Sequence, residues 1–226
     1  MRLVVAGVVI DGLLGAAAGL LAGDGVASPP SSASLVQPGT SALATRRADL
    51  DGDGQLEVAI SSVARAREGA EIPVPRLEVF DHRDGHWVLV LDATHQAPPG
   101  VEGTPDTMLA SPGPGSPGQI VQVLDVVDFA GDDVPELVAG VLTFGATAGP
   151  LELWILSMDE DQFRTEFYEK TERGGRVIVD DREVVLEFGV YEPGDPGCCP
   201  SGEARLRIFW DEAAERIVSE PLPDGA

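Results

Sequence analysis

The sequence predicts an all-β protein of about twelve antiparallel strands, arranged in propeller-like four-stranded meanders. From residue 43 on, short runs of Val, Ile, Leu and aromatic residues alternate with Gly, Asp and Pro, which is typical of strands and turns. No segment beyond the amino-terminal apolar stretch keeps a 3.6-residue period over three turns. The strand groups also recur along the chain, which indicates internal repeats.

The expected strands fall into three groups of four. They are 43–48, 56–63, 76–81 and 86–92; then 120–127, 135–142, 151–157 and 162–169; then 176–180, 183–191, 204–210 and 215–219. The turn segments 82–85 and 180–181 carry Asp and Gly in positions that favour tight hairpins.

The amino terminus has the features of an export signal. Arg2 precedes a mostly apolar stretch, and the small residues Gly25 and Ala27 offer a cleavage site. We therefore expect residues 1–27 to be a cleaved signal peptide and the protein to be secreted, extracellular or in the cell envelope. An uncleaved transmembrane anchor is the alternative, because the apolar stretch is nearly long enough to span a bilayer.

The rest of the chain is expected to form one domain. Residues 28–42 are rich in Ser, Pro and Ala and predict a flexible leader. Residues 43–226 form the all-β domain, which is interrupted at 93–118 by a Pro- and Gly-rich segment. That segment has few apolar side chains, so it predicts a long, mobile surface loop.

Composition limits the possible partners. Among 226 residues, 38 are acidic and 15 basic, which gives a formal net charge of −23. Nucleic acid is therefore excluded as a partner, because phosphate binding needs a basic surface. A strongly acidic surface suits divalent cations, or it simply keeps the protein soluble.

Residues 49–57, Asp-Leu-Asp-Gly-Asp-Gly-Gln-Leu-Glu, form an acidic loop with the oxygen pattern of a Ca²⁺ site. Carboxylates on alternate residues of a tight loop can converge on one ion, and Gly54 allows the sharp turn. The backbone carbonyl of Gln55 supplies a further oxygen. The predicted Ca²⁺ ligands are Asp49, Asp51, Asp53, Gln55 and Glu57. The alternative is an acidic turn without a metal.

A second, degraded copy of this loop lies about 79 residues later, with Asp128, Asp132 and Glu136 at matching positions. Ala130 replaces the middle carboxylate and Asp133 replaces the glycine. Fewer oxygens and a poorer turn predict much weaker Ca²⁺ binding, and a metal-free structural turn is the preferred interpretation. The strands that follow also match, since Leu-Glu-Val-Phe from residue 77 aligns with Leu-Glu-Leu-Trp from residue 151.

The first loop resembles the FG-GAP or VCBS repeat of integrin-type β-propellers, whose loop reads D-x-D-x-D-G-x-x-D/E. The resemblance covers residues 45–62 well and 123–142 weakly. The loop at 49–57 is not an EF-hand, because its twelfth position is Ile60, where an EF-hand needs a bidentate Glu, and because a β run follows. Twelve strands supply only three blades, and propellers usually have four to eight. We therefore expect an incomplete propeller or stacked sheets, with possible self-association through an edge strand.

The two cysteines, Cys198 and Cys199, are adjacent. A vicinal disulfide that stiffens a turn is the preferred interpretation, with two thiols as the alternative. The surrounding Asp-Pro-Gly-Cys-Cys-Pro-Ser-Gly and the following Arg-Leu-Arg-Ile-Phe-Trp-Asp resemble the tail of actinobacterial LppP/LprE-type lipoproteins. That resemblance implies a cell-envelope location without a defined activity, although no lipid-anchoring cysteine stands near the cleavage region.

No motif with a catalytic mechanism is present: there is no G-x-S-x-G elbow, H-E-x-x-H or glycine-rich phosphate loop. We therefore expect a non-catalytic binding or scaffold module that Ca²⁺ stabilises, with an unknown protein or an envelope polysaccharide as partner. A secreted hydrolase that uses acidic loop residues is the alternative.

Overall fold

The structure, a computed structural model, describes residues 31–64, 74–94, 97–109, 118–144, 148–159, 162–196 and 199–223. The signal peptide expected at 1–27 lies outside the described residues. Among the residues that are described, no helix has the length and hydropathy needed to span a membrane.

The described chain contains twelve strands and one helical turn, which confirms the predicted all-β class. In chain order they are α1 (Ser32–Leu35), β1 (Thr40–Ala48), β2 (Glu57–Ala64), β3 (Val74–Arg83), β4 (His86–Asp92), β5 (Gly118–Val127), β6 (Glu136–Phe144), β7 (Ala148–Asp159), β8 (Gln162–Lys170), β9 (Arg176–Asp180), β10 (Glu183–Val190), β11 (Gly202–Asp211) and β12 (Arg216–Pro221).

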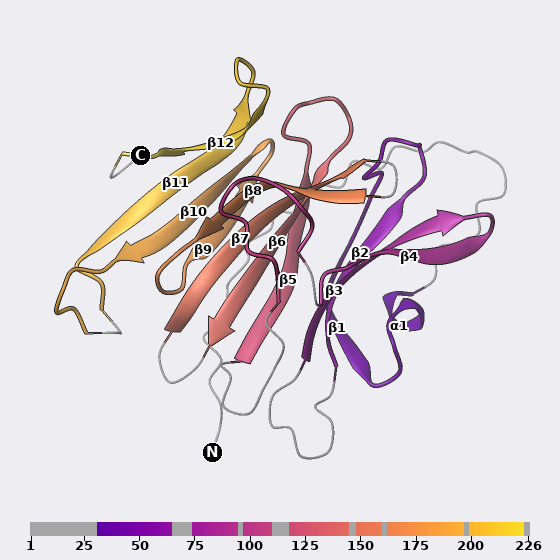
Figure 1. Cartoon of the computed structure of the whole chain (residues 1–226), viewed down its shortest axis with the longest axis horizontal. Coiled ribbons are helices and arrows are strands. Elements are labelled where there is room, and N and C mark those ends of the chain that lie inside the picture. Colours follow the sequence, from indigo (N-terminus) through magenta and orange to yellow (C-terminus); the bar gives the residue numbers. More distant parts are fainter. Residues whose placement is uncertain are drawn as a thin grey trace.

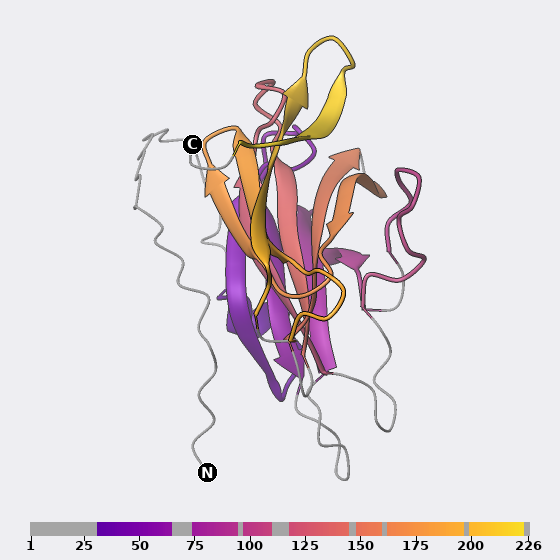
Figure 2. The same ribbon diagram turned by 90° about the vertical axis from the view of Figure 1, so that its left-hand side faces the viewer.

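The strands form three separate four-stranded sheets, each an antiparallel meander in chain order. Strands β1–β4 form the first sheet, β5–β8 the second and β9–β12 the third. Figure 1 shows the three sheets following one another across the molecule, with β5–β8 in the middle. Figure 2 shows the same sheets turned by 90°. Three successive four-stranded meanders match the expected propeller-like arrangement.

The middle sheet is buried on both faces, and the side chains alternate between them. On β6, Leu137 and Ala139 belong to the cluster shared with the first sheet, whereas Val138 belongs to the cluster shared with the third. On β7, Trp154 faces the first sheet and Ile155 the third. This alternation follows from the two-residue period of a strand, and it explains why these strands are continuous apolar runs.

A smaller cluster covers the outer face of the first sheet. Val58, Ile60 and Phe80 lie there together with Val36, which comes from the predicted leader. Because Val36 is only 8% exposed, this part of the leader packs against the sheet.

The long segment between β4 and β5 is anchored more firmly than its composition predicts. Met108 and Leu109 are each 1% exposed and belong to the core between the first two sheets. The backbone of Thr165 in β8 also accepts from the amide of Val101 (3.3 Å) and donates to the carbonyl of Pro99 (2.8 Å). The described residues 97–109 are therefore tied to the core by a few apolar side chains and to β8 by backbone hydrogen bonds.

The cross-strand register corrects one detail of the repeat. In the first sheet Ser61 pairs with Leu77, and at the equivalent place in the second sheet Gly140 pairs with Leu153. Leu77 therefore corresponds to Leu153 and not to Leu151, a slip of two residues. A slip of two leaves every side chain on its original face, so sequence alternation alone does not reveal it.

Candidate metal site

The two acidic loops lie side by side at one end of their sheets. The first connects β1 to β2 after the pair Ala48–Glu57, and the second connects β5 to β6 after the pair Val127–Glu136. The loops touch, because a Cβ placed on Gly52 would lie 3.0 Å from the side chain of Val134.

The two loops have the same backbone conformation. Gly52 and Gly131 occupy equivalent positions and both have φ of 76°. Gly54 has φ of 86°, and Asp133 at the equivalent position has φ of 70°. An aspartate tolerates this left-handed conformation better than most residues, so replacing the glycine has not changed the turn.

Three hydrogen bonds are also common to both loops. In the first loop they run from Gly54 N to Asp49 Oδ2 (2.8 Å), from Gln55 N to Asp53 Oδ1 (2.7 Å) and from Leu50 N to Glu57 Oε2 (2.6 Å). In the second loop the equivalent bonds run from Asp133 N to Asp128 Oδ2 (3.1 Å), from Val134 N to Asp132 Oδ1 (3.1 Å) and from Phe129 N to Glu136 Oε2 (3.2 Å). The repeat predicted from sequence is thus a repeat of hydrogen bonding as well.

In the first loop, three carboxylates converge. Asp49, Asp51 and Glu57 each offer an oxygen, and these oxygens lie within 4.8 Å of one another. Glu57 is fully buried, and its Oε1 has no hydrogen-bond partner within the described part of the chain. The same holds for Oδ1 of Asp49. Buried oxygens without partners are rare in folded proteins and require an explanation such as a bound ion.

Repulsion between the carboxylates adds to the cost of keeping these buried oxygens ionised. Burial raises the pKa of Glu57 to about 7; the amide of Leu50 opposes the shift, and the nearby carboxylates of Asp51, Asp81 and Asp49 add to it. Burial likewise raises the pKa of Asp51. A cation among these groups would supply the missing partner and remove the repulsion.

The side chain of Asp53, another predicted ligand, is not in this group. Asp53 is exposed, and its two oxygens accept hydrogen bonds from the backbone amide and the side-chain amide of Gln55, at 2.7 and 3.0 Å. The structure therefore brings together Asp49, Asp51 and Glu57 of the predicted set, while Asp53 and Gln55 pair with each other.

The second loop uses its oxygens internally. Where the first loop has Asp51, it has Ala130, so Asp128 Oδ1 accepts the backbone amides of both Gly131 and Asp132, the latter at 3.1 Å. Arg182, from the turn between β9 and β10, donates from Nε to the carbonyl of Asp128 (3.2 Å) and from Nη2 to that of Phe129 (3.0 Å). Backbone amides of the loop and the guanidinium of Arg182 thus provide the hydrogen-bond donors and the positive charge at the second loop.

Glu136 keeps one property of its counterpart. Burial raises its pKa to about 7; the amides of Phe129 and of Glu136 itself oppose the shift, and Asp132 and Asp128 add to it. The glutamate that begins the second strand is therefore costly to ionise in both loops.

One acidic residue at the first site was not predicted from sequence. Asp81, in β3, is 3% exposed, and its Oδ1 is buried without a hydrogen bond among the described residues. Its other oxygen is in a short hydrogen bond with Nε of Arg83. The available signal was the alternation of the strand, which puts Asp81 on the same face as the apolar residues Leu77 and Val79.

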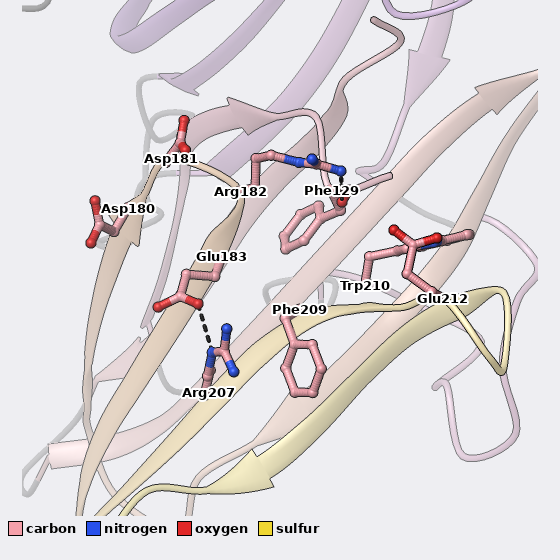
Figure 3. A pocket seen from close by; sticks show the side chains of 9 residues that line it. All are labelled: Phe129, Asp180, Asp181, Arg182, Glu183, Arg207, Phe209, Trp210 and Glu212. Carbon is pink, nitrogen blue, oxygen red and sulfur yellow. Dashed lines mark hydrogen bonds and ion pairs between the residues drawn. The ribbon is translucent and has the colours of Figure 1, made fainter. Parts of the chain in front are cut away.

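A groove of about 510 Å³ lies between the second loop and the third sheet. Figure 3 shows Arg182 directed at the carbonyl of Phe129, and Glu183 facing Arg207. Nε of Arg207 donates to Oε2 of Glu183 at 2.6 Å. Arg207 also lies over the ring of Phe209 at 4.5 Å. The connection between β9 and β10 is a short turn where the first two sheets have an acidic loop, and the groove lies beside this turn.

A smaller cavity of about 330 Å³ bears on the hydrolase alternative. Glu136, Ser157 and Glu166 line it. The hydroxyl of Ser157 donates to Glu166 at 2.6 Å, and neither of the two described histidines, His82 and His86, lines the cavity. Within the described residues, the cavity offers acidic groups but no histidine-activated hydroxyl.

The cysteine turn is only partly described. Cys199 is exposed, whereas Cys198 lies outside the described residues, so the predicted vicinal disulfide stays a prediction. Asp195 organises the described part of the turn, because its carboxylate accepts from the amide of Glu192 (2.8 Å) and from the amide and hydroxyl of Ser201 (3.0 and 2.6 Å). The hydroxyl of Ser201 and these amides lower the pKa of Asp195.

Comparison with known proteins finds one family. Residues 165–213 match the model of the LppP/LprE lipoprotein family. The match extends from within β8 to just beyond the end of β11 and includes the cysteine turn, which confirms the resemblance expected for the tail. It adds no support for the FG-GAP or VCBS resemblance of the loops. A search of curated proteins finds no match to the chain.

Proposed function

We propose that this protein is a non-catalytic module of the cell envelope whose first acidic loop binds Ca²⁺ as a structural ion. The observation that carries the proposal is the pair of buried oxygens, Glu57 Oε1 and Asp49 Oδ1, that have no hydrogen-bond partner among the described residues. Together with Asp51 they form a set of carboxylate oxygens within 4.8 Å.

The chemistry of these donors favours Ca²⁺. It is a hard cation that takes six to eight oxygens in flexible geometry. The described site offers carboxylates and no sulfur or imidazole ligand, which argues against zinc. The loop pattern resembles that of FG-GAP and VCBS repeats, where the ion fixes a loop between two strands. In this chain the ion would tie the β1–β2 loop to the sheet and to the neighbouring loop.

The proposed location rests on the similarity of residues 165–213 to LppP/LprE lipoproteins and on the export signal expected at 1–27. The family description implies a location in the cell envelope and does not imply an activity. The partner we propose is an envelope protein or polysaccharide.

The direct test is a thermal melt of the protein with Ca²⁺ and with a chelator. Binding to the folded state alone stabilises by about 2.7 kcal/mol when the ion is at 100 times its Kd, so we expect a rise in Tm of several degrees. Asp51→Ala should abolish the shift, because it removes one of the three converging carboxylates.

The matched control is Asp132→Ala, which removes one acidic residue from the neighbouring loop. It should leave the Ca²⁺ shift intact. Identical melting curves of the wild-type protein with Ca²⁺ and with chelator would overturn the proposal.

A further inference from the structure

Asp81 is the acidic residue of β3 that stands opposite the proposed ion site. The pair Val58–Phe80 is the last register pair at this end of β2 and β3, so the next positions are Glu57 and Asp81. Residues opposite each other on neighbouring strands project from the same face, with Cβ atoms about 5 Å apart. Asp81 therefore points to the side of the sheet on which Glu57 is buried.

The side chain of Asp81 has one oxygen to spare. Nε of Arg83 holds Oδ2, while Oδ1 is buried and has no hydrogen bond within the described chain. At 3% exposure, water does not solvate this oxygen freely. It is the third buried carboxylate oxygen without a partner at this end of the first sheet, after those of Asp49 and Glu57.

The second sheet provides an internal comparison. There Leu137 pairs with Leu156, so the next positions are Glu136 and Ser157. Both residues line the same cavity, as expected for side chains on one face. Ser157 thus occupies the place of Asp81. The second loop has Ala130 in place of Asp51, and its sheet has Ser157 in place of Asp81, so both carboxylates are missing there.

We propose that Asp81 is a fourth acidic residue of the Ca²⁺ site and acts through a water molecule bound to the ion. This inference rests on the proposed function of the loop. Asp81 is not among the three carboxylates whose oxygens lie within 4.8 Å of one another, so it stands outside the direct ligands. Its Oδ1 would accept a hydrogen bond from a water of the ion, and Arg83 fixes its orientation.

The test is calcium titration calorimetry of the whole chain as wild type and as Asp81→Asn. Asparagine keeps the shape and an oxygen that can accept from Arg83, but it removes the charge. Loss of an outer carboxylate that orients a metal ligand typically weakens affinity about 10- to 100-fold, and we expect a loss of about 10-fold. Terbium luminescence lifetimes in H₂O and D₂O would count the waters on the ion, and that count should not change.

Glu78→Gln is the matched control. Glu78 lies on the same strand at 3% exposure and has a buried oxygen without a hydrogen bond among the described residues, but it projects from the opposite face. Its neutralisation should change the calcium affinity less than about twofold. A melt in chelator would verify that each variant is folded.

The outcomes separate the two proposals. If the wild type binds calcium and Asp81→Asn binds it equally well, the role of Asp81 is overturned and the loop site stands. A gain of one water on terbium in Asp81→Asn would make Asp81 a direct ligand and overturn the water-mediated role. Absence of calcium binding by the wild type would overturn the proposed function itself.

Discussion

The loops at 49–57 and 128–136 share a backbone and differ in what their oxygens do. Both turn through the same left-handed positions, and both make the same three hydrogen bonds. In the first, oxygens of Asp49 and Glu57 are buried without partners. In the second, amides of the loop and the guanidinium of Arg182 complete the bonding. The two loops therefore have one conformation and differ in the side-chain oxygens that are left without a partner. Under the proposed function, these oxygens distinguish a Ca²⁺ loop from a metal-free loop.

The comparison also explains the position of the glycine that the two loops share. A Cβ on Gly52 would meet Val134 of the second loop at 3.0 Å. A Cβ on Gly131 would meet Nη2 of Arg182 from the third sheet at 2.3 Å. In each case a glycine lets the connection of the next sheet approach closely. The loops thus form one continuous end of the molecule, and the third sheet contributes an arginine where the first two contribute carboxylates.

The largest expected effect comes from removing the first aspartate of the second loop, with the first aspartate of the first loop as the comparison. Asp128→Ala removes the acceptor of three backbone amides, so we expect a loss of about 2–3 kcal/mol in the free energy of unfolding. Asp49→Ala removes the acceptor of one amide and relieves repulsion, so its loss in chelator should stay within about 1 kcal/mol. Urea unfolding with and without Ca²⁺ measures both.

The two variants should respond to Ca²⁺ in opposite ways. Asp128→Ala should keep the full stabilisation by Ca²⁺, whereas Asp49→Ala should lose it. The comparison of the loops fails if Asp128→Ala loses the Ca²⁺ response or if Asp49→Ala retains it.

The strands could be predicted from sequence because each is a run of apolar residues that ends at a Gly, Asp or Pro. For β4 and β9 the expected and observed bounds agree, and most other strands extend by one to three residues at one end or at both. Residues at strand ends gain hydrogen bonds from the neighbouring strand of the sheet, whatever their own β propensity. A single sequence does not show which residues of that strand lie opposite them. The two-residue slip in the second repeat has the same origin.

The candidate site was predictable only as far as it lies in one segment. The alternation of Asp49 and Asp51 and the position of Glu57 are visible in the sequence. The contribution of Asp81 depends on the pairing of β2 with β3, and the pairing of Asp53 with Gln55 depends on side-chain orientation. Both are tertiary facts that a motif does not contain.

A smaller effect is expected from Glu136→Gln. The pKa of Glu136 is raised to about 7 from an ordinary value of 4.5, so the folded protein holds a proton that the unfolded chain releases between these values. Stability from this group is therefore present below pH 4.5 and is lost as the pH rises to 7. Glutamine can still accept from the amide of Phe129. We expect the variant to gain about 1–2 kcal/mol relative to wild type on going from pH 4.5 to 7.5.

The measurement is the unfolding free energy of both proteins across this pH range, in chelator and in Ca²⁺. Since the second loop is interpreted as metal-free, the difference between the proteins should be the same in both series. A difference that appears only in chelator would mean that Ca²⁺ binds at Glu136, against the comparison of the loops.

The smallest expected effect is a gain of function in the second loop. Ala130→Asp restores the carboxylate that corresponds to Asp51, on a backbone that already has the right turn. Two features of the first site stay absent, because Asp128 Oδ1 is engaged by amides and Ser157 stands in place of Asp81. We therefore expect a second Ca²⁺ ion to bind with a Kd of about 1 mM, at the weak end of extracellular sites, and to add less than about 1 kcal/mol at millimolar Ca²⁺. Native mass spectrometry would count the ions, with Ala130→Asn as the uncharged control. If the second ion binds as tightly as the first, the carboxylate at position 130 alone accounts for the difference in Ca²⁺ binding between the loops. If no second ion binds, the engaged oxygens of Asp128 and the guanidinium of Arg182 account for that difference.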